Sequence, residues 1–220
     1  MPLALVVFDC DGVLLESVGA KTLAFKRIGA EFGPEAADRL TRYHILHSGV
    51  SRSEKFAWFF EEVLGRRILP EEDAALCSRF AGYCLEEVCA SPLVPGIREV
   101  LDLWHGRVPL YVASGTPQAE LADVLTRQGL ARYFAGLFGS PPGKADLLRG
   151  ILDLSGACPK ETVMVGDSRS DYDAAEKAGT LFYGRGAVFR SSGCPWHTDL
   201  TRLNSYLESL ARNISSGQII

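Results

Sequence analysis

The sequence contains no hydrophobic run that approaches the ~20 residues of a membrane-spanning helix. It also lacks a basic excess, since 23 lysines and arginines stand against 27 acidic residues and leave a net charge of −4. This balance gives no electrostatic reason to expect nucleic acid as a partner. The opening MPLALVVFDCDG has no basic leader and ends its apolar run in acids, unlike a secretion signal. We therefore expect neither a membrane nor a nucleic acid as partner.

Cysteine pairs with zinc-like spacing are also missing. The six cysteines show no CxxC motif and no dense pattern of the kind found in small disulfide-bonded domains. Cys77 and Cys84 lie on an apolar helical stripe, where a free thiol behaves as a small hydrophobic side chain. Free thiols fit a reducing compartment, so the expected location is cytoplasmic. There is also no internal repeat that would indicate a solenoid.

Most of the chain alternates strands with helices. The aliphatic run over residues 3–8 predicts a strand buried on both faces. Further strands are predicted at Pro109–Thr116, which is expected to run into a loop of small residues at its Ser-Gly-Thr end, at Gly136–Ser140 and at Thr162–Ser168. Each is followed by a helical pattern, and another strand is predicted at TLFYG, residues 180–184. This order predicts an α/β fold, with a parallel, doubly wound, Rossmann-like sheet.

A helical segment interrupts this alternation after the first strand. Ser51 and Glu54 form a capping-box pattern ahead of one helix, for which Gly65 is the expected stop, and Pro70 opens another. We predict a core made of residues 1–16 and 91–220 and an inserted helical domain made of residues 17–90. The stretch 186–200 is expected to be a closing loop that leads into the last helix.

Polar side chains stand where the predicted strands end. Asp9 and Asp11 follow the first strand, Ser114 the second, and Asp167 and Asp171 the fourth. The helix after the third strand opens with a lysine at position 144. Ligands of parallel α/β sheets bind at the carboxyl ends of the strands, so we expect these groups to meet in one pocket.

The chemistry of this set indicates a metal ion and a phosphate. Three neighbouring carboxylates favour a hard, oxygen-seeking cation such as Mg²⁺. A phosphoryl group would bind that metal and would also accept hydrogen bonds from Ser114, Lys144 and the backbone N–H groups of the loop. Asp9 and Asp11 would otherwise repel each other, because they point to the same side of the strand.

Each residue also has a purely structural interpretation. Asp9 and Asp11 match a turn after a strand, and Ser114 matches a helix cap. Lys144 matches a solvated surface lysine. Asp167 and Asp171 match acids that stabilise a helix N-terminus. The functional interpretation depends on all of these groups occurring together.

Four segments resemble the motifs of the haloacid dehalogenase-like hydrolases. The D-x-D-G-[TV]-L pattern occurs at Asp9–Leu14, a strand ending in serine at Ser114, a helix-opening lysine at Lys144, and G-D-S-x-x-D at Gly166–Asp171. The resemblance extends to about Gly186. The helical insertion is similar to the small α-helical cap of phosphoglycolate phosphatase and β-phosphoglucomutase relatives.

The resemblance implies phosphoryl transfer through a covalent aspartyl phosphate. Asp9 would be the nucleophile, and Asp11 would protonate the leaving alcohol and then take a proton from the hydrolytic water. Asp167 would hold Mg²⁺ together with the carboxylate of Asp9 and the backbone carbonyl of Asp11.

The remaining motif residues would serve the phosphate. Ser114, the backbone of Gly115 and Lys144 would hold its oxygens as negative charge builds up on them. Asp171 would orient Lys144 or a metal-bound water.

The segment Gly49-Val50-Ser51-Arg52 resembles a cap segment of β-phosphoglucomutase-like proteins. In those proteins an arginine grips a second, distal anionic group of the substrate, which makes Arg52 a candidate for substrate binding. Lys21, where the chain enters the cap, is a second candidate. In the structural alternative, Ser51 caps the helix and Arg52 is a solvated residue of its first turn.

The leading expectation is a Mg²⁺-dependent phosphatase that hydrolyses a small phosphate monoester. The alternative is a sugar-phosphate mutase with the same intermediate, although the chain reads G-D-S where β-phosphoglucomutases tend to read E-D-S, and it lacks K-P-x-P-D after Lys144. A catalytically silent binding protein would be expected to have lost a nucleophile or a metal ligand. The sequence predicts no oligomeric state.

Overall fold

The computed structural model describes residues 3–47 and 51–212. The chain divides into two compact units: Met1–Glu16 with Pro92–Ile220, and Ser17–Ser91. The first is called the core unit below and the second the helical unit. The helical unit ends at Ser91, one residue later than the sequence indicated.

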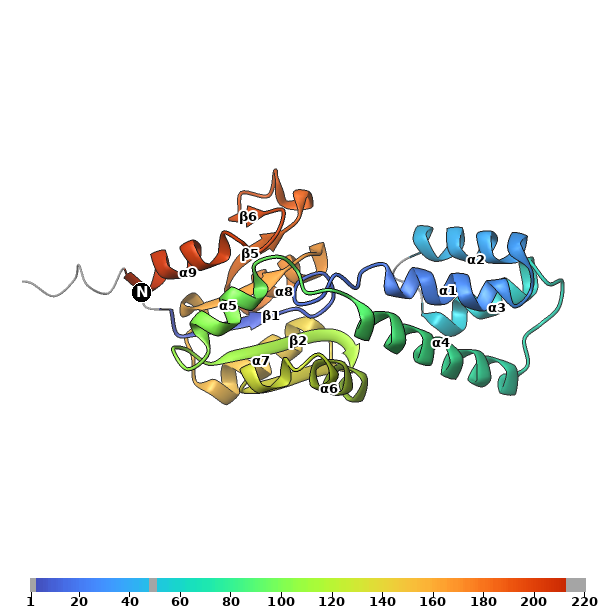
Figure 1. Ribbon diagram of the computed structural model, residues 1–220, viewed down its shortest axis with the longest axis horizontal. Helices are drawn as coiled ribbons and strands as arrows, with labels where there is room; N and C mark the ends of the chain where they lie inside the picture. The colour runs from blue at the N-terminus through green and yellow to red at the C-terminus, as the bar shows by residue number, and fades with distance from the viewer. Residues whose placement is uncertain (1–2, 48–50, 213–220) are drawn as a thin grey trace, which may run out of the picture. The chain divides into compact units, whose positions relative to one another are not determined.

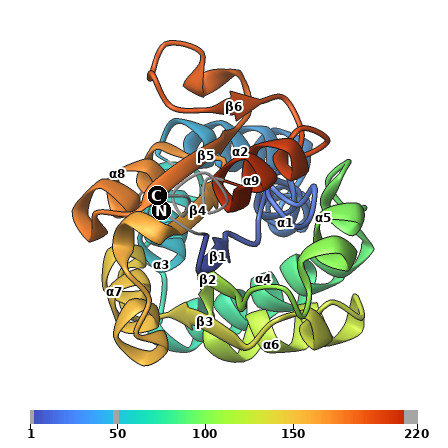
Figure 2. The same cartoon turned by 90° about the vertical axis from the view of Figure 1, so that its left-hand side faces the viewer.

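A parallel sheet forms the centre of the core unit, with six strands in the described part of the chain. The strands are β1 (Leu5–Phe8), β2 (Leu110–Pro117), β3 (Gly136–Ser140), β4 (Thr162–Gly166), β5 (Leu181–Arg185) and β6 (Trp196–His197). Their spatial order is β3-β2-β1-β4-β5-β6, and every neighbouring pair is parallel (Figure 2). The chain therefore builds the sheet outward from β1 in one direction and from β4 in the other. The predicted doubly wound α/β fold is confirmed.

Helices cover both faces of this sheet. They are α5 (Ile97–Trp104), α6 (Gln118–Arg127), α7 (Lys144–Ser155), α8 (Arg169–Ala178) and α9 (Leu203–Arg212). Figure 2 shows α7 and α8 on one face of the sheet and α5 and α9 on the other. Leu5 and Val7, which alternate with their neighbours along β1, share a buried cluster with Leu148 of α7. On the other face, Trp104 Nε1 donates to Asn204 Oδ1 at 3.0 Å and links α5 to α9.

This topology brings two strand ends together where ligands bind in such folds. β1 and β4 are neighbours in the sheet but belong to its two oppositely built halves. The crevice beyond the carboxyl ends of two such strands is the usual ligand site of an open α/β sheet. Asp9 follows β1 and Asp167 follows β4.

The helical unit contains four helices in the described part of the chain, grouped together in Figure 1. They are α1 (Ala20–Ala30), α2 (Pro34–Leu46), α3 (Arg52–Glu62) and α4 (Pro70–Ala90). Phe25, Phe56 and Phe80 meet in its core, with 4.4 Å between the ring centroids of Phe25 and Phe80. The predicted capping box is confirmed: the Ser51 hydroxyl accepts a hydrogen bond from Glu54 N, and the Glu54 carboxylate accepts one from Ser51 N.

Three local expectations are corrected. α3 ends at Glu62, before Gly65, although Gly65 does adopt a positive φ of 69°. β2 continues through the Ser-Gly-Thr sequence to Pro117, where a loop was expected. The stretch 186–200 is not only a closing loop, because Trp196–His197 pairs with the end of β5 as a sixth strand.

Three further observations concern membrane-spanning helices, the cysteines and the predicted cap segment. Within the described residues, no helix combines the length and the apolar character that crossing a membrane requires. All six cysteines are free thiols, with Cys84 buried and Cys77 half-buried. Gly49 and Val50 of the predicted cap segment lie outside the described residues.

Candidate active site

The site starts from Asp9, the first residue after β1. Its backbone N–H donates to the carbonyl of Val165 at 3.0 Å, so the main chain of β4 fixes its position. Its side chain is buried. Burial raises the pKa of Asp9 to about 7, against the opposing influence of the Lys144 ammonium, and the charges of Asp171 and Asp11 raise it further.

Lys144 lies beside Asp9 because it is the first residue of α7. Its Nζ is 2.9 Å from Oδ1 of Asp9 and also pairs with Oδ1 of Asp171, and only 14% of its side chain is exposed. Burial opposes protonation of this amine, but the carboxylates of Asp9 and Asp171 outweigh that effect and raise the pKa of Lys144. The structure thus holds a charged ammonium between two carboxylates. Lys144 is therefore not the solvated surface lysine that the structural interpretation of the sequence allowed.

Asp171 is fully buried and holds Lys144 from the other side. Its Oδ2 accepts hydrogen bonds from the Ser168 hydroxyl at 2.7 Å, from Ser168 N at 3.0 Å and from Asp167 N at 3.2 Å. These bonds form the capping box of α8 and leave Oδ1 for Lys144. Gly166 is required for this approach, because a Cβ there would lie 2.3 Å from Cβ of Asp171.

Ser114 and Asp11 are linked through Thr116. Ser114 is 1% exposed, and its Oγ accepts a hydrogen bond from Thr116 N at 3.1 Å. The Thr116 hydroxyl donates to Oδ2 of Asp11 at 3.1 Å. Gly115, between them, is exposed, with open space where a Cβ would stand. Ser114 therefore lies inside β2, and Thr116, two residues further along the strand, contacts the turn that carries the second acid of the first motif.

The acids converge as a divalent cation would require. Carboxylate oxygens of Asp9, Asp167 and Asp171 all lie within 4.8 Å of one another. Carboxylate oxygens are the ligands that Mg²⁺ prefers, so the donor set fits this ion. Both oxygens of Asp171 are engaged, Oδ1 by Lys144 and Oδ2 by three hydrogen bonds, whereas Lys144 pairs with Oδ1 of Asp9, so Asp9 and Asp167 are the better pair for a metal. Burial, with the nearby charge of Asp171, raises the pKa of Asp167 to about 6.

The structure therefore brings Asp9, Asp11, Ser114, Lys144, Asp167 and Asp171 to the carboxyl ends of β1, β2 and β4. A model of the haloacid dehalogenase-like hydrolases matches residues 3–179. The chain belongs to this family. The resemblance predicted from the four motifs is confirmed.

Comparison with known proteins finds phosphatases among the proteins that are similar to this chain. The hydrolase is 30% identical over 190 residues to phosphoglycolate phosphatase of Pasteurella multocida, covering 82% of this chain and 84% of that protein. It is 28% identical over 191 residues to phosphoglycolate phosphatase 1 of Pseudomonas aeruginosa, covering 80% of this chain but only 66% of that longer protein. The comparisons indicate a phosphoric monoester hydrolase.

A solved structure confirms the architecture. β-Phosphoglucomutase from Clostridium difficile superposes with a TM-score of 0.71 at 17% identity, over 98% of this chain and 99% of that one. At this level of identity, the likeness shows a shared fold and leaves the reaction open.

Two candidate residues belong to the helical unit. Lys21 is exposed on α1, and Arg52 is the first residue of α3, with its guanidinium 5.2 Å from the centre of the Phe80 ring. The structure also shows a buried lysine that the sequence analysis missed: Lys55, 2% exposed, has its Nζ 3.0 Å from Nδ1 of His44. The sequence gave a signal, since Lys55 lies one helical turn before Phe59 and therefore on the apolar face of α3, where a lysine is unusual.

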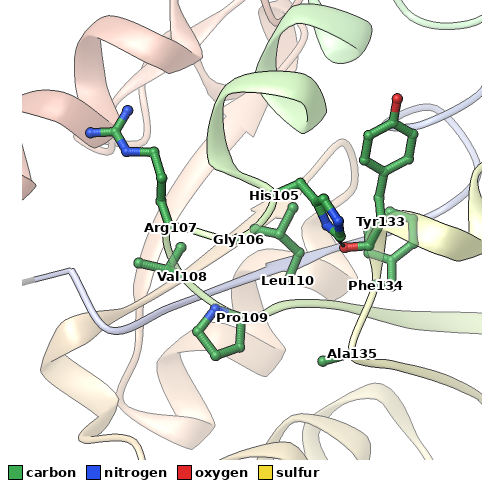
Figure 3. Close-up of a pocket in the computed structure, with 9 residues that line it drawn as sticks. All are labelled: His105, Gly106, Arg107, Val108, Pro109, Leu110, Tyr133, Phe134 and Ala135. Atoms are coloured by element: carbon green, nitrogen blue, oxygen red, sulfur yellow. Dashed lines mark hydrogen bonds between the residues drawn. The ribbon is translucent and has the colours of Figure 1, made fainter.

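One pocket of this hydrolase lies away from the motif residues. Figure 3 shows a cavity of about 360 Å³ lined by His105, Tyr133 and the start of β2. Leu110 opens β2, whereas Ser114 lies further along the same strand, so this cavity is at the amino end of the strand. None of the motif residues lines it. The candidate site is the carboxylate cluster and not this cavity.

Proposed function

We propose that this hydrolase is a Mg²⁺-dependent phosphatase that cleaves a small phosphate monoester through an aspartyl phosphate. The observation that carries the proposal is Lys144, held between the carboxylates of Asp9 and Asp171. The ammonium balances the negative charge of the buried Asp9 carboxylate. It also lies beside the position to which a phosphoryl group would bring further negative charge during transfer to Asp9. The phosphatases among the relatives support the same reaction.

Asp9 acts as the nucleophile in this scheme. A carboxylate oxygen of Asp9 forms a bond to phosphorus while the bond from phosphorus to the ester oxygen breaks. Asp11 gives its proton to the departing alcohol, and the Thr116 hydroxyl at 3.1 Å orients the Asp11 carboxyl for this step. Water then attacks phosphorus, Asp11 takes up a proton from it, and Asp9 is released together with inorganic phosphate.

Ser114, the backbone of Gly115 and Lys144 bind the phosphoryl oxygens. The carboxylates of Asp9 and Asp167 and the backbone carbonyl of Asp11 would hold Mg²⁺, which would supply positive charge to screen the phosphate from the nucleophile. Asp171 acts on Lys144 by fixing the position of its ammonium. We place the enzyme in the cytoplasm, in keeping with its six free thiols.

The helical unit supports a substrate with a second anionic group. Lys55 is buried, and no carboxylate pairs with it among the described residues. A buried cation without a negative partner costs free energy, which a bound anion would offset. We propose that Lys55 joins Lys21 and Arg52 in substrate binding and that the substrate carries a carboxylate or a second phosphate.

The test is turnover of a panel of phosphate monoesters, among them phosphoglycolate and ethyl phosphate, with and without Mg²⁺. We expect inorganic phosphate as product, loss of turnover on chelation, recovery when Mg²⁺ is returned, and no turnover by Asp9→Asn. Phosphate found on a new hydroxyl of the substrate would instead establish a mutase. Turnover that persists in Asp9→Asn would overturn the covalent step, and no turnover of any ester would favour a binding protein.

The second anionic group is tested with Lys55→Met. This variant should raise KM for phosphoglycolate at least ~10-fold, since an ion pair between bound ligand and protein is worth about 1.5–3 kcal/mol. KM for ethyl phosphate should change little. Equal changes for both substrates would exclude a role of Lys55 in recognising the second anion.

A further inference from the structure

Arg185, the last residue of β5, contacts three separate segments of the core unit. Its Nη1 donates to the carbonyl of Gly12 at 3.0 Å, and its Nη2 pairs with Oε1 of Glu16 at 2.5 Å. Its Nε donates to the carbonyl of Thr198 at 3.3 Å. The side chain is 18% exposed. A guanidinium in which each of the three nitrogens donates to a different fixed acceptor is held in one orientation.

The Gly12 carbonyl belongs to the tight turn that carries Asp11. The carbonyl of Cys10 accepts hydrogen bonds from the N–H groups of Val13 and Leu14, at 3.3 and 2.9 Å, and Gly12 N donates to the carbonyl of Leu15 at 2.8 Å. Gly12 has a φ of 73°, which a residue with a Cβ rarely adopts. The carbonyl that Arg185 holds is therefore one peptide unit away from Asp11.

Glu16 fixes the other end of this segment. It is the last residue of the core unit before the chain enters the helical unit. Its N–H donates to the carbonyl of Pro92, where the chain returns, at 2.9 Å, and Val94 N donates to the carbonyl of Leu14 at 3.1 Å. The segment from Asp11 to Glu16 is thus held by backbone bonds on one side and by Arg185 on the other.

A simple stabilising role does not account for this arrangement. The Arg185–Glu16 pair is partly exposed, and such pairs contribute only about 0–1 kcal/mol to stability. The hydrogen bond from Arg185 to the Gly12 carbonyl is charge-assisted, and it fixes the position of the backbone in this turn. This turn also carries Asp11, whose carboxyl accepts a hydrogen bond from Thr116 on β2.

We propose that Arg185 is a positioning residue, which holds the turn from Asp11 to Glu16 so that the Asp11 carboxyl is placed for proton transfer to the leaving alcohol. This inference rests on the proposed function, in which Asp11 is the general acid. The hydrogen bonds of Arg185 go to Gly12, Glu16 and Thr198, and its positive charge also lowers the pKa of Asp167 against the larger effect of burial. Nothing in the four motifs includes it, and it lies 173 residues from Gly12 in the sequence.

The test uses leaving groups of different basicity. An alkyl phosphate needs its departing oxygen protonated, whereas 4-nitrophenolate leaves without help, so a misplaced acid slows the alkyl ester selectively. We expect Arg185→Ala to lower kcat on ethyl phosphate by ~10- to 100-fold more than on 4-nitrophenyl phosphate, because a displaced acid loses only part of the ~10²- to 10⁴-fold that general acid catalysis supplies. Arg185→Lys should recover part of the difference, because an ammonium can still reach one of the three acceptors.

Two further variants keep the result interpretable. Glu16→Gln leaves the bond from Arg185 to Gly12 intact and should give a smaller selective loss, and it serves as well if Arg185→Ala fails to fold. Arg127→Ala removes an exposed arginine from its pair with Asp123 on α6 and should change neither rate. Thermal unfolding of each variant reports its stability independently.

Asp11→Asn separates this inference from the proposed function. If it shows no selective loss on ethyl phosphate, Asp11 is not the acid and the proposed function is wrong on that point. If Asp11→Asn shows the selective loss but Arg185→Ala and Glu16→Gln slow both esters by the same factor, or neither, Arg185 does not position the acid and the inference is overturned.

Discussion

The imidazole of His44 stacks on the ring of Phe25, with 4.5 Å between the ring centroids and an interplanar angle of 30°. The ammonium of Lys55 approaches both rings: it is 3.0 Å from Nδ1 of His44 and 5.3 Å from the centre of the Phe25 ring. Because the ammonium can only donate, Nδ1 must accept, and the imidazole is neutral. Burial, with the charges of Lys55 and Lys21, lowers the pKa of His44 to about 4.

This arrangement predicts that His44 contributes a part of the stability that is lost in acid. In the unfolded chain His44 has its ordinary pKa of 6.5, so below that pH it takes up a proton that the folded protein refuses. The stabilising contribution of neutral His44 is complete above pH 6.5 and is lost as the pH falls toward 4. One proton changes the free energy of unfolding by at most about 1.4 kcal/mol per pH unit. Urea unfolding between pH 7 and 4 measures this dependence.

The matched variants are His44→Gln and His47→Gln. His44→Gln should remove the part of the pH dependence that His44 contributes. Asp9 and Asp167, whose pKa values are raised to about 7 and about 6, also titrate in this window and act with the opposite sign, so the quantity to compare is the difference between variant and wild type. His47 is exposed at the end of α2, and its replacement should leave the dependence as in the wild type. A pH dependence that is the same in His44→Gln and in the wild type would show that His44 makes no contribution to it.

Asp171→Asn tests whether Lys144 depends on its second carboxylate. The amide cannot pair with the ammonium as a carboxylate does, so Lys144 should lose its fixed position beside Asp9. We expect kcat to fall at least ~10-fold and the free energy of unfolding to fall by about 1–3 kcal/mol, as for other buried charged hydrogen bonds. Inhibition by inorganic phosphate should weaken in parallel.

The control is Asp173→Asn on the same helix. Asp173 is exposed and pairs with Arg169, so its loss should change stability and kcat only slightly. If Asp171→Asn keeps the phosphate inhibition of the wild type while it loses stability, Asp171 serves the α8 capping box alone and has no influence on Lys144.

The members of the site differ in how far the sequence predicted them. Asp9, Lys144 and Asp167 stand at the junction of a strand or a helix with a loop, and such junctions are visible in the pattern of apolar residues. Thr116 and Arg185 reach their partners 105 and 173 residues away, Asp11 and Gly12, through the register between strands. No local pattern encodes that register, so their roles required the structure.

The same distinction applies to the fold. The buried strands β1 and β4 are continuous aliphatic runs and were predicted, and the capping box before α3 was found from two residues. β6 contains only Trp196–His197, too short to show a periodicity. Its place in the sheet depends on two backbone hydrogen bonds, from Gly184 N to Pro195 O and from Gly186 N to His197 O. No local pattern in the sequence indicates these bonds.

Asp167→Asn tests the metal site without relying on turnover alone. In the wild type, Mg²⁺ should raise the melting temperature, since a ligand that binds only the folded state stabilises it. Asp167→Asn should weaken Mg²⁺ binding, measured by calorimetry, by at least ~10-fold, the lower end of the losses seen even for residues that only support a metal ligand. The exposed Asp146→Asn is the control. Equal Mg²⁺ affinity in Asp167→Asn and the wild type would remove Asp167 from the metal site.

Gly166→Ala and Gly150→Ala form a matched pair that isolates the approach of α8 to β4. At Gly166 the added Cβ would lie 2.3 Å from Cβ of Asp171, so strand and helix must separate. We expect this variant to lose about 1–3 kcal/mol of stability through overpacking, and to lose activity because Asp171 and then Lys144 are displaced. Gly150 of α7 has nothing within 4 Å of an added Cβ, so its replacement should leave kcat unchanged and add about 0.5–1 kcal/mol of helix stability. Urea unfolding and steady-state kinetics measure both quantities. Full activity in Gly166→Ala would show that Asp171 does not need its close contact with β4 to hold Lys144.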